Sequence, residues 1–461
     1  MMNFIFYLIM IMISGIFYGM SILQSRPHKN ILLENTLPNE ALHSEELADF
    51  IKKHRQKNLF VALFSIIFYL PLLFISYDSL LILYFFVGMF AEIGVFYALQ
   101  VISIGRLYHL KVAQNWQVPT AEKIIVDTKT IQQKNQKIIS PWWFMLSLLL
   151  NIIASWLIYT IFKTGAAFWW TLIGSMALTF LFVGLYQIIK HLPVKANTKD
   201  ASINQQFNDL FVHDWSLLTG VSSLVLAVIP FFIPLSLNAI PPFDTILFSV
   251  LIIAVIAYIG WTFWLLFNTR KKQDNLLAKS QIIYRDEDPF WRFGIYNNPA
   301  DKRLNVPDRI GMNISVNFGR PFGKLIYSLL GVFLVALVVF VTVPMLKADF
   351  SDDAFVGEIQ DQVVLLKAPL AADAHIKFSE IERVEEISEL PKNRLRIAGT
   401  ATNHYLTGKF QIAGSSAKLY IYQPSQPILK ISTKNTIYYF ASKNSADTKK
   451  LAEELTSQFT K

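Results

Sequence analysis

The chain of 461 residues contains no cysteine. This absence excludes disulfide bonds, thiol catalysis and thiolate metal sites together. Its eight histidines are scattered, and none stands in an HExxH or another metal-ligand spacing. The sequence also lacks a GxSxG nucleophile elbow, a Walker phosphate loop and a GxGxxG fingerprint. We therefore expect a protein that is not an enzyme and that holds no cofactor or metal.

Charge is also scarce, since only 16% of the residues are charged while 53% are hydrophobic, among them 37 phenylalanines. Such a composition indicates a polytopic membrane protein. Eight runs are long and apolar enough to cross about 30 Å of hydrocarbon. The predicted spans are Asn3–Met20, Leu59–Ser76, Leu80–Ile104, Trp142–Ile161, Phe168–Ile189, Trp215–Leu235, Thr245–Phe267 and Leu325–Val343.

The links between these runs alternate in charge. The links after the second, fourth and sixth runs carry at most one cation, Lys163, whereas those after the first, third, fifth and seventh are rich in Lys and Arg. Basic loops stay in the cytoplasm, so a multi-pass protein of the cell membrane with both termini extracytoplasmic is predicted. The formal net charge of +9 then belongs to the cytoplasmic loops. It does not indicate a nucleic-acid partner. Membrane lipid is the partner expected of a chain with these spans.

Three regions follow from this pattern: a transmembrane bundle over 1–346, a small cytoplasmic module at 283–324 within it, and an extracytoplasmic domain at 347–461.

Residues Met1–Ser25 are compatible with a cleaved signal peptide or an uncleaved helix, and we favour the helix because no basic residue precedes the apolar run. Residues Asn39–Lys57 predict a helix that leads into the second span, with an apolar stripe that lies on the bilayer or on other loops. Lys123–Thr130 predicts a strand or short hairpin.

The module, from Asp286 to Pro321, is rich in turn formers and has one alternating run, which predicts a small β-rich fold. Its polar and aromatic residues form a candidate ligand site; the alternative is that they are turn formers and local salt bridges. The candidate residues are Asp288, Trp291, Tyr296, Asn298, Asp301, Arg309, Asn317 and Arg320.

The tail divides into about seven short strands followed by an amphipathic helix, Ser445–Phe459. This order is that of a pleckstrin-homology-type barrel. Its predicted core comprises Val363, Ile381, Leu395, Phe410, Leu419, Ile421, Leu429, Ile431 and Tyr439, with Leu451 and Leu455 covering one opening. Basic residues in the tail are spread among acids, so peptide or protein contacts are expected rather than lipid headgroups.

Three stretches resemble known families. The residues Asp288, Trp291, Gly294, Tyr296-Asn297-Asn298-Pro299, Asp301, Val306-Pro307, Arg309, Gly311, Asn317 and Gly319-Arg320 resemble a small domain of bacterial polytopic membrane proteins. The tail resembles a bacterial pleckstrin-homology-like domain, chiefly over Arg394–Phe440 (RLRIAGTAT, then Gly408-Lys409-Phe410, KLYIY and PILKISTKNTIYYF). Asn39–Leu59 and Asn115–Trp143 resemble membrane proteins of the SdpI immunity and signalling family. That family lacks this tail, so its role in peptide-toxin immunity does not transfer directly.

Glu92 is the ionisable residue near the centre of a predicted span, and Gln100 follows two helical turns later. A charge at that depth costs a few kcal/mol, so the carboxyl group faces protein or water. The functional interpretation is a proton or ion site in a secondary transporter. The structural interpretation is a neutral carboxyl hydrogen-bonded to a neighbouring helix. Our leading hypothesis is different: a non-enzymatic protein for envelope sensing, signalling or immunity, whose C-terminal domain binds a peptide or protein.

Overall fold

The computed structural model describes residues 2–119, 132–162, 165–194, 196–238, 243–284, 287–309, 314–391, 394–412 and 414–459. The strand or hairpin predicted at Lys123–Thr130 lies outside these ranges.

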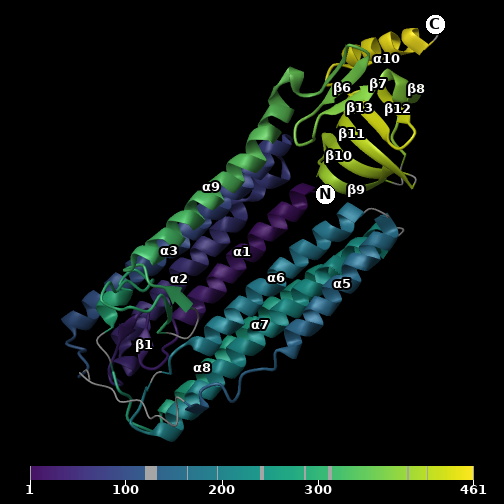
Figure 1. Ribbon diagram of the computed structural model, residues 1–461. Helices are drawn as coiled ribbons and strands as arrows, with labels where there is room; N and C mark the ends of the chain where they lie inside the picture. Colours follow the sequence, from purple (N-terminus) through teal and green to yellow (C-terminus); the bar gives the residue numbers. More distant parts are fainter. Residues whose placement is uncertain are drawn as a thin grey trace. The chain divides into compact units, whose positions relative to one another are not determined.

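Eight helices of the described chain are long and apolar enough to cross a membrane. They are α1 (Met2–Gln24), α2 (Glu45–Phe68), α3 (Asp78–Ala113), α5 (Trp142–Phe162), α6 (Gly165–His191), α7 (Ala201–Asn238), α8 (Phe243–Leu277) and α9 (Pro321–Phe350) (Figure 1). Seven of them contain the whole of one predicted span, whereas α2 ends at Phe68 and its span, Leu59–Ser76, continues through a 3-10 turn, Leu70–Leu73. The eight helices confirm the multi-pass membrane protein. Several helices are longer than their spans because charged and polar residues continue them beyond the apolar run.

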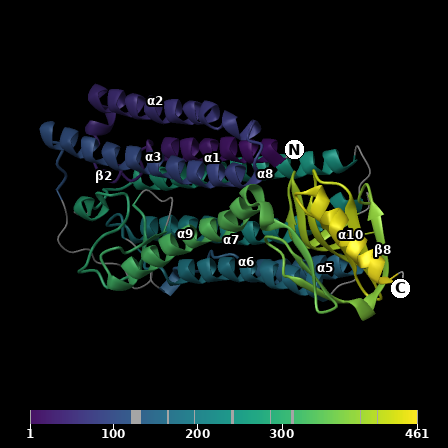
Figure 2. The same ribbon diagram turned by 90° about the horizontal axis from the view of Figure 1, so that it is seen from above.

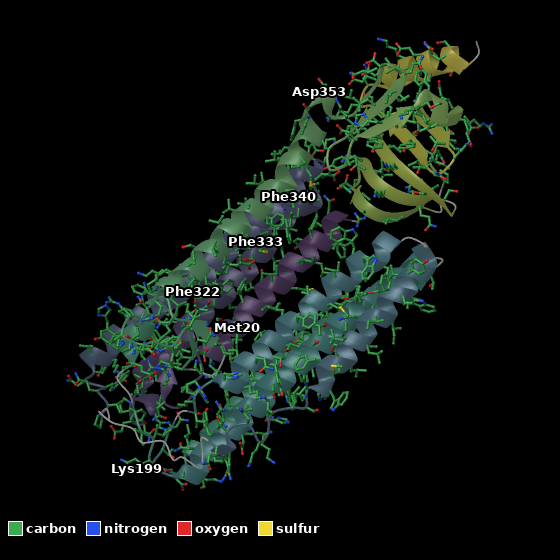
Figure 3. The ribbon with its side chains drawn as sticks, viewed as in Figure 1. Met20, Lys199, Phe322, Phe333, Phe340 and Asp353 are labelled. Atoms are coloured by element: carbon green, nitrogen blue, oxygen red, sulfur yellow. The ribbon has the colours of Figure 1, made fainter. Side chains whose placement is uncertain are left out.

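The surfaces of these helices carry the apolar side chains expected in contact with lipid. On α9, Phe333 is 61% and Phe340 73% exposed, and Figure 3 shows both along the helix. An exposed apolar surface of this extent is unfavourable in water and stable in hydrocarbon.

Contacts between Cα atoms divide the chain into two compact units. The membrane unit contains Met12–Ser65 and Glu92–Leu330, and the tail unit contains Met1–Ile11, Ile66–Ala91 and Gly331–Lys461. Several long helices thus contribute one end to each unit.

In the membrane unit, α5, α6 and α7 pack against one another (Figure 2), and α8 packs on α7. The Asn151 amide of α5 donates a 2.9 Å hydrogen bond to Thr179 Oγ1 of α6, a polar contact that suits helix association in lipid. A short hairpin, β1 (Ile31–Leu32) and β2 (Asn35–Thr36), follows α1.

The helix predicted to start at Asn39 begins later. A 3-10 turn, Ala41–His43, comes first, and α2 starts at Glu45 with the Ser44 hydroxyl accepting a hydrogen bond from the Leu47 amide. The apolar stripe that includes Leu47 packs against the β1–β2 segment and α3. The interpretation that this stripe lies on other parts of the protein is therefore the correct one, because Leu47 is 1% exposed.

The module has less strand than its sequence predicts in the part that the structure describes. It consists of a 3-10 turn, Asp288–Trp291, and an antiparallel pair, β3 (Asn305–Pro307) with β4 (Ile314–Val316). Its core is the buried cluster of Trp291, Tyr296 and Val306.

The C-terminal domain has the predicted pleckstrin-homology-like architecture, and its described strands form two sheets and not a closed barrel. One sheet has the order β5-β6-β7, and the other has the order β8-β12-β13-β11-β10-β9. The strands are β5 (Val356–Gln360), β6 (Val363–Lys367), β7 (Ala374–Lys377), β8 (Ile381–Ile387), β9 (Arg394–Ala401), β10 (Tyr405–Ile412), β11 (Ser415–Tyr422), β12 (Ile428–Thr433) and β13 (Ile437–Ala441). The closing helix α10 spans Ser445–Phe459, as predicted.

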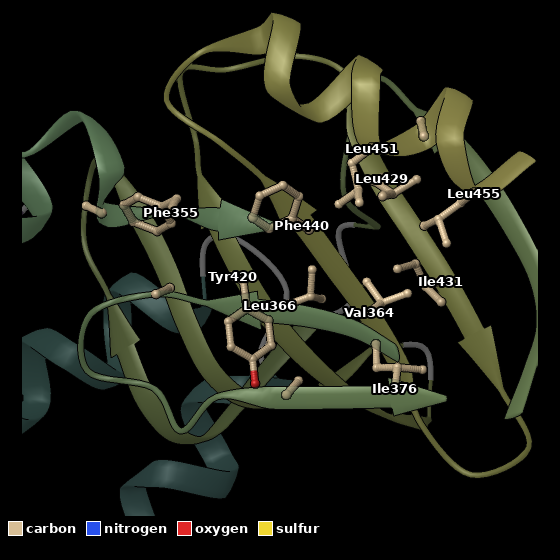
Figure 4. Packing of buried hydrophobic residues seen from close by; sticks show 14 of the residues in the cluster. Phe355, Val364, Leu366, Ile376, Tyr420, Leu429, Ile431, Phe440, Leu451 and Leu455 are labelled. Atoms are coloured by element: carbon tan, nitrogen blue, oxygen red, sulfur yellow. The ribbon is translucent and has the colours of Figure 1, made fainter. Parts of the chain in front are cut away.

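The larger sheet is buried on both faces, so the domain has two apolar cores rather than one. The first core lies among β5–β7, the larger sheet and α10, and includes Ile381, Leu429, Ile431, Leu451 and Leu455 (Figure 4). The second core lies on the opposite face, and its predicted members are Phe410, Leu419, Ile421 and Tyr439. Of the other predicted core residues, Val363 is half-buried and the Leu395 side chain lies outside the described set.

Candidate functional site

Asp288 is the centre of a buried charged cluster that joins three parts of the membrane unit. Its carboxylate accepts hydrogen bonds from the Thr36 amide (3.1 Å), the Thr36 hydroxyl (2.8 Å) and Lys111 Nζ (2.7 Å). It also lies 2.7 Å from Arg309 Nη1. Thr36 belongs to β2, Lys111 to the end of α3 and Arg309 to the module. We call these four residues the Asp288 cluster.

Arg309 extends the cluster toward the segment after α1. Its guanidinium donates a 2.6 Å hydrogen bond to the Glu34 carbonyl and a further one to the Thr36 hydroxyl. The side chains of Arg309 and Asp288 are 3% and 7% exposed. Burial alone would raise the pKa of Asp288, but the charge of Arg309 and the hydrogen bond from Lys111 lower this pKa below its usual value. The carboxylate therefore stays ionised at neutral pH.

A second network fixes the turns of the module. Tyr296 donates a 2.9 Å hydrogen bond to Asp301 Oδ2, and the Asn298 amide donates to the Tyr296 hydroxyl at 3.1 Å. Arg303 makes hydrogen bonds to both Asp301 oxygens. Burial alone would raise the pKa of Asp301, but the hydrogen bonds from Arg303 lower it to about 2. This network holds the chain reversal between Tyr296 and β3.

Asn317 closes the same network from the other side and is completely buried. Its side-chain oxygen accepts from the Asn298 and Gly319 amides at 3.0 Å, and its amide donates to the carbonyls of Asn298, Asp301 and Arg303. All of the bonding capacity of this amide is thus used within the module.

The start of α9 packs directly on this network. An idealised Cβ at Gly323 would lie 2.0 Å from the Asn317 carbonyl oxygen, so glycine is required at this close approach. Arg320, the last of the candidate residues, is half-buried just before α9, and its amide donates to the Asn317 carbonyl at 3.2 Å.

The cavity beside these residues is small. It is lined by Lys29, Thr36, Tyr284, Glu287 and Arg309, among others, and its volume is about 50 Å³. Since one water needs about 10–15 Å³ of such space, the cavity accommodates a few waters and not an organic ligand. The arrangement fits a structural connection between α3, the segment after α1 and the module better than a binding pocket.

Glu92 and Gln100 are not brought together. Glu92 is 4% exposed, and its carboxyl accepts a 2.5 Å hydrogen bond from the Ser14 hydroxyl of α1. Gln100 instead lies against the module, where its amide nitrogen would be 3.1 Å from a Cβ built at Gly294. The hydrogen bond between α3 and α1 is the contact that the structural interpretation of Glu92 predicts.

The tail unit contains a second buried polar site, formed by the C-terminal domain and the helix ends in that unit. Asp78, the first residue of α3, has a side chain that is 1% exposed. Its Oδ2 accepts from the His404 amide at 3.2 Å and lies 3.1 Å from His404 Nδ1. The carboxylate of Asp349 accepts from the Ser79 amide at 2.7 Å, and the Asp349 carbonyl accepts from Lys443 Nζ at 2.8 Å.

The apolar core of the domain continues into the same helix ends. Met345 and Ala348 of α9 are members of the first core, and Ile82 of α3 and Val341 of α9 pack against it. Burial, with the charges of Asp349 and Asp78, raises the pKa of Tyr405 well above its usual value, so this hydroxyl stays neutral. The domain is therefore joined to α3 and α9 by shared packing and hydrogen bonds as well as by the chain itself.

Residues 358–458 match the family of bacterial PH domains. The match begins in β5 and ends in α10, so it covers the strands and the closing helix of the C-terminal domain. Comparisons with curated proteins and with solved structures gave no match. The PH-like domain expected from the sequence is thus confirmed. The match does not extend to Asn39–Leu59 or Asn115–Trp143, and the resemblance of those stretches to the SdpI family stays a prediction.

The residues that attach the PH-like domain to the helices were hard to identify from the sequence. Asp78 is an isolated acid in a short link between two apolar runs, and that position is the one signal that could have singled it out. Its partner His404 is separated from it by 326 residues in the chain. The pair could therefore be identified only once the fold was known.

Proposed function

We propose that this protein is a non-enzymatic membrane receptor or binding protein whose PH-like domain captures a peptide or protein of the cell envelope. The helices anchor the domain in the cell membrane, with both termini outside the cytoplasm, and relay its occupancy to the cytoplasmic module. Envelope sensing, signalling or immunity of the SdpI type are the roles that this arrangement fits.

The observation that carries the proposal is the continuity of the first core with α3 and α9. A domain on a loose tether would bind its ligand without affecting the helices. Here Met345 and Ala348 are buried in the domain core, and Asp78 and Asp349 are hydrogen-bonded around the first turn of α3. A ligand that shifts the domain must then also shift these helix ends, because packed cores resist gradual deformation.

The edge strand β9 is the surface on which we place a peptide ligand. It lies at one end of the larger sheet and pairs with β10 alone among the described strands. The other edge, β8, is charged and contacts α10, whereas the central part of β9 (Ile397–Thr400) carries no charge. An extended peptide can add to such an edge through backbone hydrogen bonds.

Orientation is tested by adding protease to intact protoplasts. The proposal predicts that residues 347–461 are removed while Asp286–Pro321 is spared. Protection of residues 347–461 would contradict it.

Peptide capture is tested with a photo-reactive amino acid in place of Ala398, an exposed residue of β9. The matched control is Glu386, an exposed residue of β8 in the same sheet. We expect a cross-linked envelope peptide or protein at position 398 and little at 386. Equal yields at both positions would reject β9 as the binding surface.

The alternative function, a secondary transporter, rests on Glu92 alone. Glu92→Gln retains a side-chain oxygen that can accept the hydrogen bond from Ser14, so expression should stay normal. A transporter that uses this carboxylate would lose any transport or resistance phenotype in this variant. An unchanged phenotype would leave Glu92 with the structural role only.

A further inference from the structure

A groove of about 480 Å³ lies between the last turns of α1 and the first half of α2. It belongs wholly to the membrane unit, and Figure 2 shows α1 and α2 side by side. Tyr18, Ser25, Pro27, Ala48, Ile51, Lys52, Arg55, Gln56 and Leu59 line it. The α2 residues among them recur at intervals of three and four, so they form one face of the helix.

The face of α2 that lines the groove ends in apolar residues. Lys52, Arg55 and Gln56 lie before the predicted span, which starts at Leu59. Leu59 is 39% exposed, and Leu63, which continues the same face, is 54% exposed. The groove thus opens toward the predicted span of α2, so in a bilayer its basic residues are expected near the lipid headgroups.

The charge at this site is positive and has no carboxylate counterion among the residues that the structure describes. Arg55 Nε donates to the Ser25 hydroxyl at 2.8 Å and Nη2 donates to the Ser25 carbonyl at 3.3 Å. These neutral acceptors orient the guanidinium without cancelling its charge. Arg26, next to Ser25, is close enough to repel it electrostatically. Within the described ranges, neither arginine nor Lys52 forms an ion pair with a carboxylate.

The neighbouring lysine shows the opposite case. Lys53 lies 2.6 Å from Asp49 Oδ2, one turn earlier on α2, and it does not line the groove. The two adjacent lysines therefore differ. Lys52 lines the groove and has no described carboxylate partner, whereas Lys53 is paired with Asp49 on the surface.

We propose that this groove binds an anionic phospholipid, with its phosphate against Arg55 and Lys52 and an acyl chain along Leu59. A guanidinium held by neutral acceptors offers its remaining N–H groups to phosphate oxygens, which suit its planar geometry. The volume is within the range of sites for small ligands, about 300–1,000 Å³. The apolar face of α2 next to the groove favours a lipid over a soluble phosphate as the ligand, because it can pack against an acyl chain.

Native mass spectrometry of the full-length protein tests this, with phosphatidylglycerol and phosphatidylcholine titrated as probes. The decisive pair of variants is Lys52→Glu and Lys53→Glu, which change the net charge of the protein equally and which replace exposed side chains. A juxtamembrane cation is worth about 1 kcal/mol toward anionic lipid, so removing Lys52 should weaken phosphatidylglycerol binding roughly fivefold or more. Lys53→Glu should leave it within twofold of the wild type, and phosphatidylcholine should bind weakly throughout.

Arg55→Gln provides a second variant, for which a loss of phosphatidylglycerol binding at unchanged helicity is expected. The proposal is overturned if Lys52→Glu has no effect, if Lys53→Glu weakens binding equally, or if both lipids bind alike. Displacement of the lipid by millimolar inorganic phosphate would also overturn it, because it would identify a soluble anion as the occupant.

Discussion

Replacing Asp288 with asparagine should open the connection between the module and the segment after α1. The substitution keeps the shape of the side chain but removes the charge that Arg309 and Lys111 share. Arg309 is buried and Lys111 is half-buried, with side chains 3% and 14% exposed. Removing one partner of a buried ion pair costs about 3–5 kcal/mol, because the remaining charge stays desolvated.

The Thr36 amide reports this loss directly, since it donates to the Asp288 carboxylate at 3.1 Å. At about 1.4 kcal/mol per factor of ten, the loss corresponds to roughly 10²- to 4 × 10³-fold faster hydrogen exchange where exchange proceeds through local opening. Hydrogen exchange of the detergent-solubilised protein, followed by mass spectrometry of peptides that contain Thr36, measures it.

The matched control is Asp301→Asn in the same module. Its partner Arg303 is 40% exposed, so water can replace the lost charge and the effect should be about 1 kcal/mol or less. Unchanged hydrogen exchange at Thr36 in Asp288→Asn, or an equal increase in exchange in Asp301→Asn, would refute the conclusion that the Asp288 cluster connects the module to the segment after α1.

Three further predictions concern the module and the PH-like domain. The pKa of Asp301 is about 2 in the folded protein and about 3.9 in an unfolded chain. The difference in melting temperature between the wild type and Asp301→Asn should therefore be constant above about pH 5 and vanish toward pH 2. A difference that does not depend on pH would contradict this. Gly323→Ala should destabilise the start of α9 by more than 1 kcal/mol, seen as faster proteolysis of the module, because a Cβ would collide with a backbone carbonyl oxygen. Leu451→Ala should lower the free energy of unfolding by about 2–5 kcal/mol and raise the rate of hydrogen exchange in the PH-like domain. Its control, Glu453→Ala at an exposed neighbouring residue, should change the free energy of unfolding by less than about 0.5 kcal/mol. Equal effects of the two substitutions would exclude the closing role of α10.

The helices could be predicted from the sequence because each must provide a long apolar run, and all eight appear at the expected places. Most strands of the PH-like domain were predictable for a similar reason, since alternation marks them. The first strand, β5, escaped prediction. Its residues are all half-buried or exposed. Gly357 packs against Leu451 and Phe440, and a glycine at this core position gives no hydrophobic signal in the sequence.

The division of the apolar residues between two cores was not predictable. Alternation shows that Leu419 and Tyr420 point to opposite faces, but both faces are buried. Which elements cover each face depends on contacts between strands far apart in the chain. The Asp288 cluster was beyond sequence analysis for the same reason, because its partners Thr36 and Lys111 are separated from Asp288 by 252 and 177 residues.

The proposed orientation places the PH-like domain outside the cytoplasm and the module inside. Because the chain has no cysteine, one introduced thiol reports its location without a background. Ser457→Cys on α10 and Lys302→Cys in the module both replace exposed residues. In intact protoplasts, a membrane-impermeant maleimide should label position 457 and should label position 302 only after the membrane is permeabilised. Labelling of position 302 with protection of position 457 would contradict the orientation and the proposed function that depends on it.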